Sequence, residues 1–202
     1  MSLSLTSCDG GTVLAWSKYA GDWFNHYTAL RSSAPEIPLA YPPGGGAIDF
    51  GTTYTTDPLK VESYDASAEA GGTFYYRAMA FDAEDRVVAA SPVKSAVAKA
   101  PLALGALDVT AGDAGITNFG WTPYGGPGAC FTYYKLAYSA DDPTPSYMEG
   151  SPLLAAIGEQ GAAGYAAGDV APGTYWFRLQ AIRVTSLGKF LVAETDVTQF
   201  TP

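Results

Sequence analysis

Residues that could perform acid–base or metal chemistry are sparse in this 202-residue chain. It contains one histidine, His26, so neither a histidine-based metal cluster nor an HExxH metalloprotease motif can form. The acidic pairs Asp82/Asp85 and Asp141/Asp142 fall in turn-like sequence, where solvated carboxylates are a simpler interpretation than a catalytic dyad or a calcium site. A G-x-S-x-G nucleophile elbow and a P-loop are both absent. We therefore expect no catalytic, cofactor or metal site, and a protein that is not an enzyme.

The charge balance excludes further classes of partner. Eleven Lys and Arg face twenty Asp and Glu, which gives a formal charge of −9. Sequence-independent binding to nucleic acid or anionic lipid needs basic patches, so we expect neither, although the same charge is ordinary for a soluble surface. No stretch is apolar for long enough to span a membrane, and we expect no membrane insertion.

The chain is built around a repeated stretch. Residues 72–80 (GTFYYRAMA) return 101 positions later as residues 173–181 (GTYWFRLQA). Each copy has a Gly-Thr turn, a run of aromatic residues and Arg-x-x-Ala, and a tyrosine, Tyr64 or Tyr165, stands thirteen residues before the arginine. Repetition over about 100 residues indicates two modules, each long enough to bury its own core.

The short Ala100-Pro101 linker places these modules at residues 1–99 and 102–202. The 23 Gly and 14 Pro, with little charge, favour many short strands joined by tight turns. Residues 35–51, rich in Gly and Pro, indicate a long loop or an edge segment, and no run is long enough for a convincing helix. Strands are expected at residues 3–5, 13–16, 27–31, 59–64, 74–81 and 86–98, and again at 107–109, 116–121, 131–138, 175–184 and 190–198.

The spacing of the aromatic residues resembles that of the fibronectin type III domain, once in each half. The first copy has Trp16, Tyr27 and the Phe74-x-x-Arg77-x-x-Ala80 strand. The second copy has Trp121, Tyr134 and Tyr175-x-x-Arg178-x-x-Ala181. The resemblance implies an all-β chain of two seven-stranded β-sandwiches in tandem, with each tryptophan on one sheet and the paired tyrosine on the other.

In that family a tyrosine at the start of the sixth strand donates its hydroxyl to nearby backbone, forming a tyrosine corner. Tyr175 can play this part in the second module, whereas Phe74 has no hydroxyl. We therefore expect the corner of the first module to be less well tied, unless a neighbour such as Tyr75 replaces the missing bond.

The resemblance also brings two loops together at one pole of the first module, the aromatic segment 17–26 and the turn from Asp82 to Arg86. Exposed Trp and Tyr beside polar groups are favoured at recognition surfaces and where sugars stack. The alternative is that Trp23 and Phe24 fold back over the core, or face an upstream domain. The candidate binding residues are Tyr19, Trp23, Phe24, His26, Asp85 and Arg86.

The two cysteines fall at opposite poles of their modules under the same resemblance. If the modules stack end to end, Cys8 and Cys130 come together and can form a disulfide in an oxidising compartment. The alternative is one thiol half-buried in each module.

These expectations describe a binding or spacer fragment of a bacterial secreted or surface-anchored protein, whose signal and anchor lie outside this sequence. Its partner would be a protein or a glycan at the cell surface. Two alternatives remain: an accessory module that contacts glycan for a polysaccharide-degrading enzyme, and a subunit that self-associates into a surface filament.

Overall fold

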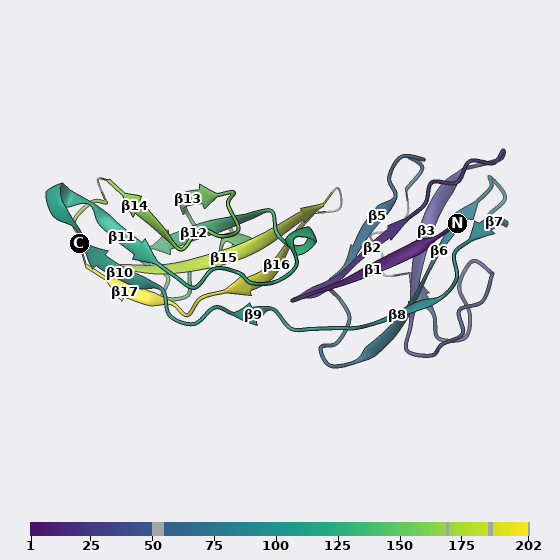
Figure 1. The fold of residues 1–202 in the computed structure, drawn as a ribbon, viewed down its shortest axis with the longest axis horizontal. Coiled ribbons are helices and arrows are strands. Elements are labelled where there is room, and N and C mark those ends of the chain that lie inside the picture. Colours follow the sequence, from purple (N-terminus) through teal and green to yellow (C-terminus); the bar gives the residue numbers. More distant parts are fainter. Residues whose placement is uncertain (50–54, 169, 186–187, 202) are drawn as a thin grey trace. The chain divides into compact units, whose positions relative to one another are not determined.

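The computed structural model describes residues 1–49, 55–168, 170–185 and 188–201 (Figure 1). It is an all-β protein, whose described residues form strands and three 3-10 turns. The chain divides into two compact units, the first made chiefly of Met1–Ala100 and the second of Pro101–Val184 and Lys189–Pro202. Within the described ranges, no helix has the length and apolar character needed to cross a membrane.

The first unit consists of two antiparallel sheets. One has the order β1-β2-β5, and the other has the order β4-β3-β6-β7, with β8 also paired to β6. Their strands are β1 (Leu3–Cys8), β2 (Gly11–Trp16), β3 (His26–Ser32), β4 (Ile48–Asp49), β5 (Glu62–Asp65), β6 (Thr73–Phe81), β7 (Val87–Ala90) and β8 (Lys94–Val97).

Both faces of the second sheet in this unit are covered. On the inner face, Trp16 of β2 meets Tyr27 of β3 edge to face, with ring centroids 5.8 Å apart. Strand alternation turns Met79 and Phe81 of β6 to the other face, where Ile37 packs against them. Part of the Gly/Pro-rich segment therefore covers the sheet, which explains why β3 is buried along its whole length. Residues 50 and 51 of that segment lie outside the described residues.

The second unit repeats this two-sheet plan. A three-stranded sheet has the order β10-β11-β14, and a larger sheet has the order β13-β12-β15-β16-β9, with β17 paired to β15. Trp121, just after β11, meets Tyr134 of β12 with ring centroids 5.6 Å apart, as Trp16 meets Tyr27. The strands are β9 (Leu102–Ala103), β10 (Asp108–Ala111), β11 (Thr117–Gly120), β12 (Tyr133–Ser139), β13 (Leu153–Ile157), β14 (Gly164–Ala167), β15 (Tyr175–Thr185), β16 (Gly188–Glu194) and β17 (Thr198–Phe200), and the 3-10 turns are η1 (Asp113–Gly115), η2 (Gly128–Cys130) and η3 (Tyr147–Glu149).

The final strand of each unit is interrupted, so the described strands number eight and nine rather than seven in each. Pro92 breaks the first because it has no N–H to donate to the ladder. At the break, the Ser91 hydroxyl accepts the Ala78 N–H at 3.1 Å. In the second unit the Thr195 hydroxyl accepts the Leu179 N–H, also at 3.1 Å. The parallel strand β9 adds a further element to the second unit.

The tyrosine corner is one expectation that the structure corrects. On the inner face of β6 the fully buried tyrosine is Tyr76, two positions beyond Phe74, and its hydroxyl donates to Asp65 Oδ2 at 3.0 Å. The equivalent residue in the second unit is Phe177, which packs against Phe119 and has no hydroxyl. Among the described residues, the Tyr175 hydroxyl has no hydrogen-bond partner. The tyrosine hydroxyl that fastens this strand by a hydrogen bond is therefore in the first unit, whereas the sequence predicted it in the second.

Candidate recognition groove of the first unit

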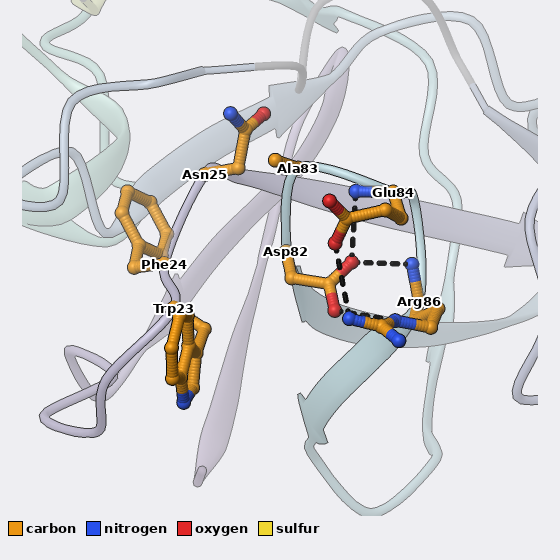
Figure 2. A pocket seen from close by; sticks show the side chains of 7 residues that line it. All are labelled: Trp23, Phe24, Asn25, Asp82, Ala83, Glu84 and Arg86. Carbon is orange, nitrogen blue, oxygen red and sulfur yellow. Dashed lines mark hydrogen bonds and ion pairs between the residues drawn. The ribbon is translucent and has the colours of Figure 1, made fainter.

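A groove of about 530 Å³ lies between two loops of the first unit (Figure 2). One side is formed by the segment between β2 and β3, and the other by the β6–β7 turn. These are the two loops that the sequence analysis placed at one pole. The lining residues are Trp23, Phe24 and Asn25 from the first loop and Asp82, Ala83, Glu84 and Arg86 from the second.

The aromatic loop has a fixed base on the core. The buried Tyr27 hydroxyl accepts the Tyr19 N–H at 2.6 Å, and the Tyr19 hydroxyl donates to the Asp22 carbonyl at 3.0 Å. Phe24 packs on the Tyr27 ring with centroids 4.5 Å apart. At the end of the loop, the Asn25 N–H donates to the backbone carbonyl of Phe81, the last residue of β6, at 2.8 Å. Phe24 therefore folds back over the core, as the alternative interpretation of this loop expected.

Trp23 behaves differently from its neighbour. Its side chain is among the exposed large hydrophobic groups of the chain, at 82% relative exposure. Its φ is +69°, in the left-handed region that non-glycine residues seldom adopt. Such a conformation costs about 1–3 kcal/mol, and an indole left in water contributes little burial to offset it. Folding alone thus gives no reason for a tryptophan at this position.

The opposite side of the groove is a turn organised by Asp82. Its Oδ1 accepts the N–H groups of Glu84 at 3.0 Å and Arg86 at 2.9 Å, and its Oδ2 accepts Arg86 Nε at 2.7 Å. Arg86 Nη2 also donates to Glu84 Oε2 at 3.0 Å. Figure 2 shows these side chains gathered across the groove from Trp23 and Phe24.

The titration of the turn follows from these contacts. Desolvation opposes ionisation of Asp82, but the hydrogen bonds from Arg86 and Glu84 outweigh it and lower the pKa of Asp82. The hydrogen bond and charge of Asp82, with the charge of Glu84, raise the pKa of Arg86. Asp82 and Arg86 therefore form an ion pair near neutral pH, and both line the groove.

His26, a candidate binding residue, is not at the surface, which is a correction to the sequence analysis. It is the first residue of β3, is fully buried, and stacks on Phe81 with centroids 4.7 Å apart and ring planes 9° apart. Burial lowers its pKa, while the charges of Asp85 and Asp49 oppose that shift. His26 thus belongs to the packed sheet because both faces of β3 are covered.

Only some of the other candidate binding residues line the groove. Trp23, Phe24 and Arg86 line the groove, whereas Tyr19 supports the loop from below. Asp85 has a φ of +57° at the turn, and its Oδ1 lies 4.0 Å from His26 Nε2. Asp82, which organises the turn, is not among the candidate residues, although its spacing of four from Arg86 is the signal that could identify it.

The remaining acidic pair also serves a turn. Asp142 Oδ1 accepts the Thr144 N–H at 2.8 Å and the Thr144 hydroxyl at 2.9 Å. Within the part of the chain that the structure describes, no group of three or more His, Cys, Asp or Glu residues could hold a metal ion.

Comparison with known proteins finds similarity at the level of structure. No family model matches the chain, and no curated protein matches it. Among solved structures, it is similar to the FN1–FN3 domains of chicken CNTN1, with a TM-score of 0.44 and 10% sequence identity. The match covers 99% of this chain and 65% of that structure's chain.

Proposed function

We propose that this chain is a non-catalytic, fibronectin type III-like binding and spacer fragment, and that its recognition surface is the groove beside Trp23. The supporting observation is an indole that is 82% exposed on a strained backbone, directly beside a turn held rigid by Asp82. Strain retained at an exposed aromatic residue favours a role in binding over a role in folding. The partner would be a protein or a glycan outside the cell.

The test uses arrays of purified extracellular proteins and of glycans, probed with the labelled full chain. We expect a reproducible partner whose binding is lost in Trp23→Ala. Tyr165→Ala is the matched control, because Tyr165 is an exposed aromatic residue of the second unit and lies outside the groove. Equal binding by the wild type and Trp23→Ala would exclude the groove as the recognition surface.

A glycan is the second candidate for this groove, as in an accessory module of a polysaccharide-degrading enzyme. Its support is the side-chain chemistry, an open indole face beside the Asn25 amide and the Arg86 guanidinium. An aromatic ring stacks on a sugar ring, and planar polar groups bind its hydroxyls. Signals confined to the glycan array and lost in Trp23→Ala would select this function.

Self-association into a surface filament is a further proposal. It draws on β13, a five-residue strand that ends the order of the larger sheet in the second unit, with Leu153 39% exposed. Exposed sheet edges are templates for pairing with another chain. Concentration-dependent growth in light scattering would support a filament, and a monomer at every concentration would eliminate it.

We also propose that Cys8 and Cys130 form a disulfide, which suits a secreted or surface location. Cys8 ends β1, Cys130 ends η2, and neither exposes surface to solvent. A bridge closing so long a loop stabilises by about 4–5 kcal/mol in the chain-entropy model. Intact mass and thiol alkylation under non-reducing and denaturing conditions test this, and two alkylated cysteines would contradict it.

A further inference from the structure

Two lysines and two tyrosines form a cluster in the second unit, which we call the Tyr147 cluster. Tyr133 and Lys135 lie on β12, Tyr147 on η3 and Lys189 on β16. Lys135 Nζ is 4.4 Å from the Tyr133 ring centroid and 5.1 Å from that of Tyr147. Lys189 Nζ is 4.7 Å from the Tyr147 centroid and also donates to its hydroxyl. Two ammonium groups thus share one phenol ring.

The backbone at Tyr147 is held in place by a buried side chain. Gln180 of β15 is 1% exposed, and its Oε1 accepts the Tyr147 N–H at 2.8 Å. Its Nε2 donates to Glu194 Oε2 at 2.9 Å and to Ser146 Oγ at 3.3 Å. These bonds attach η3 to the sheet, so the cluster is organised before any ligand arrives.

The two ammonium groups lack acidic partners. Within the described residues, no carboxylate lies within 4.0 Å of either Lys135 or Lys189. By contrast Arg178, on β15 of the same sheet, has Glu194 at 3.5 Å. The chain has twenty acidic residues and a net charge of −9, so a shortage of carboxylates does not explain why Lys135 and Lys189 have no acidic neighbour within this distance.

The cluster also changes the pKa values of its two tyrosines. The Lys189 hydrogen bond is the main cause that lowers the pKa of Tyr147, assisted by the charges of both lysines. Burial and the neighbouring Tyr147 raise the pKa of Tyr133 to about 12. An anion that approaches Tyr147 therefore meets the two ammonium groups of Lys135 and Lys189 beside the tyrosine rings.

The position of the cluster in the sheet restricts the class of ligand that it can bind. Strand β12 is an interior strand between β13 and β15: Lys135 is paired with both neighbours, and Tyr133 is paired with β15. An extended peptide cannot add to an interior strand, because strand addition needs a free edge. Recognition must rely on side chains, with ammonium groups for an oxyanion and phenol rings and hydroxyls for its carrier. We propose that the Tyr147 cluster binds a carboxylate or sulfate group of an acidic glycan.

The experiment titrates the full chain with four hexameric probes: oligogalacturonate, heparin oligosaccharide, neutral cello-oligosaccharide and hexaglutamate. Binding is followed by calorimetry and by the NMR shifts of Tyr133 and Tyr147. The test variant is Lys135→Gln/Lys189→Gln, and the matched control is Lys60→Gln/Lys94→Gln in the first unit. Thermal unfolding confirms that both double variants are folded.

We expect one or both acidic oligosaccharides to bind, to shift Tyr147, and to bind about tenfold more weakly in the test variant but not in the control. Preference for oligogalacturonate assigns a carboxylate, and preference for heparin assigns a sulfate. Failure of both acidic oligosaccharides to bind, equal weakening in the control, or equal binding of hexaglutamate would each overturn the proposal. Because Trp23 plays no part in this cluster, Trp23→Ala leaves the expected result unchanged, which keeps this test separate from that of the groove.

Discussion

The buried cluster around Asp65 allows the sharpest prediction about stability. Arg31 is 9% exposed and Asp65 is 1% exposed, and Arg31 Nη1 donates to both carboxylate oxygens at 2.9 and 3.0 Å. Asp65 also accepts the Tyr76 hydroxyl, and the N–H and hydroxyl of Ser67. Asp65→Ala removes the carboxylate from a buried guanidinium and leaves it the Ser67 hydroxyl, which Arg31 Nη1 contacts at 2.9 Å; loss of the charged partner costs about 3–5 kcal/mol.

The substitution Tyr76→Phe perturbs the Asp65 cluster less severely. It removes one hydrogen bond to a carboxylate that keeps its other donors, so we expect a loss of about 1–2 kcal/mol. Tyr75→Phe, at the adjacent half-buried position on β6, is the control and should change stability by less than about 0.5 kcal/mol. For a unit of about 100 residues, 3 kcal/mol corresponds to a fall in Tm of about 12 °C or more.

Thermal unfolding combined with hydrogen exchange on the full chain measures these effects. Peptides from β3, β5 and β6 should exchange faster in Asp65→Ala, while peptides from β12 and β15 should keep their wild-type rates. A loss below about 1 kcal/mol in Asp65→Ala, or a larger loss in Tyr75→Phe than in Tyr76→Phe, would refute the account of how this unit is tied.

Three further predictions concern single groups. Burial lowers the folded-state pKa of His26 below its usual 6.5, so the stability that neutral His26 contributes is complete above pH 6.5 and is lost as pH falls through the folded-state pKa. When the pH is lowered from about 8 to about 5, the denaturant midpoint should therefore fall less in His26→Phe than in wild type. Lys189→Gln removes the main cause of the low pKa of Tyr147, so that pKa should rise toward its usual value in an NMR titration of ¹³C-labelled tyrosine, and an unchanged pKa would contradict the Tyr147 cluster. Tyr134→Phe removes two hydrogen bonds of the hydroxyl, one accepted from the Tyr124 N–H at 2.7 Å and one donated to the Gln160 carbonyl at 2.6 Å. This should cost about 1–3 kcal/mol of stability and speed hydrogen exchange in residues 122–130, and exchange at the wild-type rate there would contradict this role.

Much of the fold could be predicted because the aromatic pattern is strong. The contacts of Trp16 with Tyr27 and of Trp121 with Tyr134 follow from their spacing, since each pair fills the space between two sheets. Strand β14 was missed because Gly- and Ala-rich sequence has little intrinsic strand preference, and β13 was missed because its short apolar run does not alternate; pairing with β11 and β12 decides their structure.

The tyrosine corner shows where pattern reasoning fails. The repeat aligns Phe74 with Tyr175, but the fully buried residue is Tyr76, two positions along β6 and on the same face, whereas Phe74 is only partly buried against that core. The structure turns Tyr76 inward, and its bond to Asp65 could not be read from sequence because the two residues meet only through the packing of the sheets.

The candidate groove was predicted in part. The sequence indicates which loops meet, and it suggests Trp23 and Arg86 as binding residues. It cannot distinguish Trp23 from Phe24, because both are aromatic residues in one loop, and only the backbone conformation decides which one is buried. His26 was misplaced for the same reason, since its burial depends on Phe81 stacking against it.

The most direct test of the central claim is to measure stability and binding together in Trp23→Gly. Glycine adopts the φ of +69° without strain, so we expect the free energy of unfolding to be unchanged or raised by up to about 1 kcal/mol, while binding to the partner found on the arrays is lost. A variant that loses stability by more than about 1 kcal/mol, or that binds as the wild type does, would show that Trp23 serves the fold and not recognition.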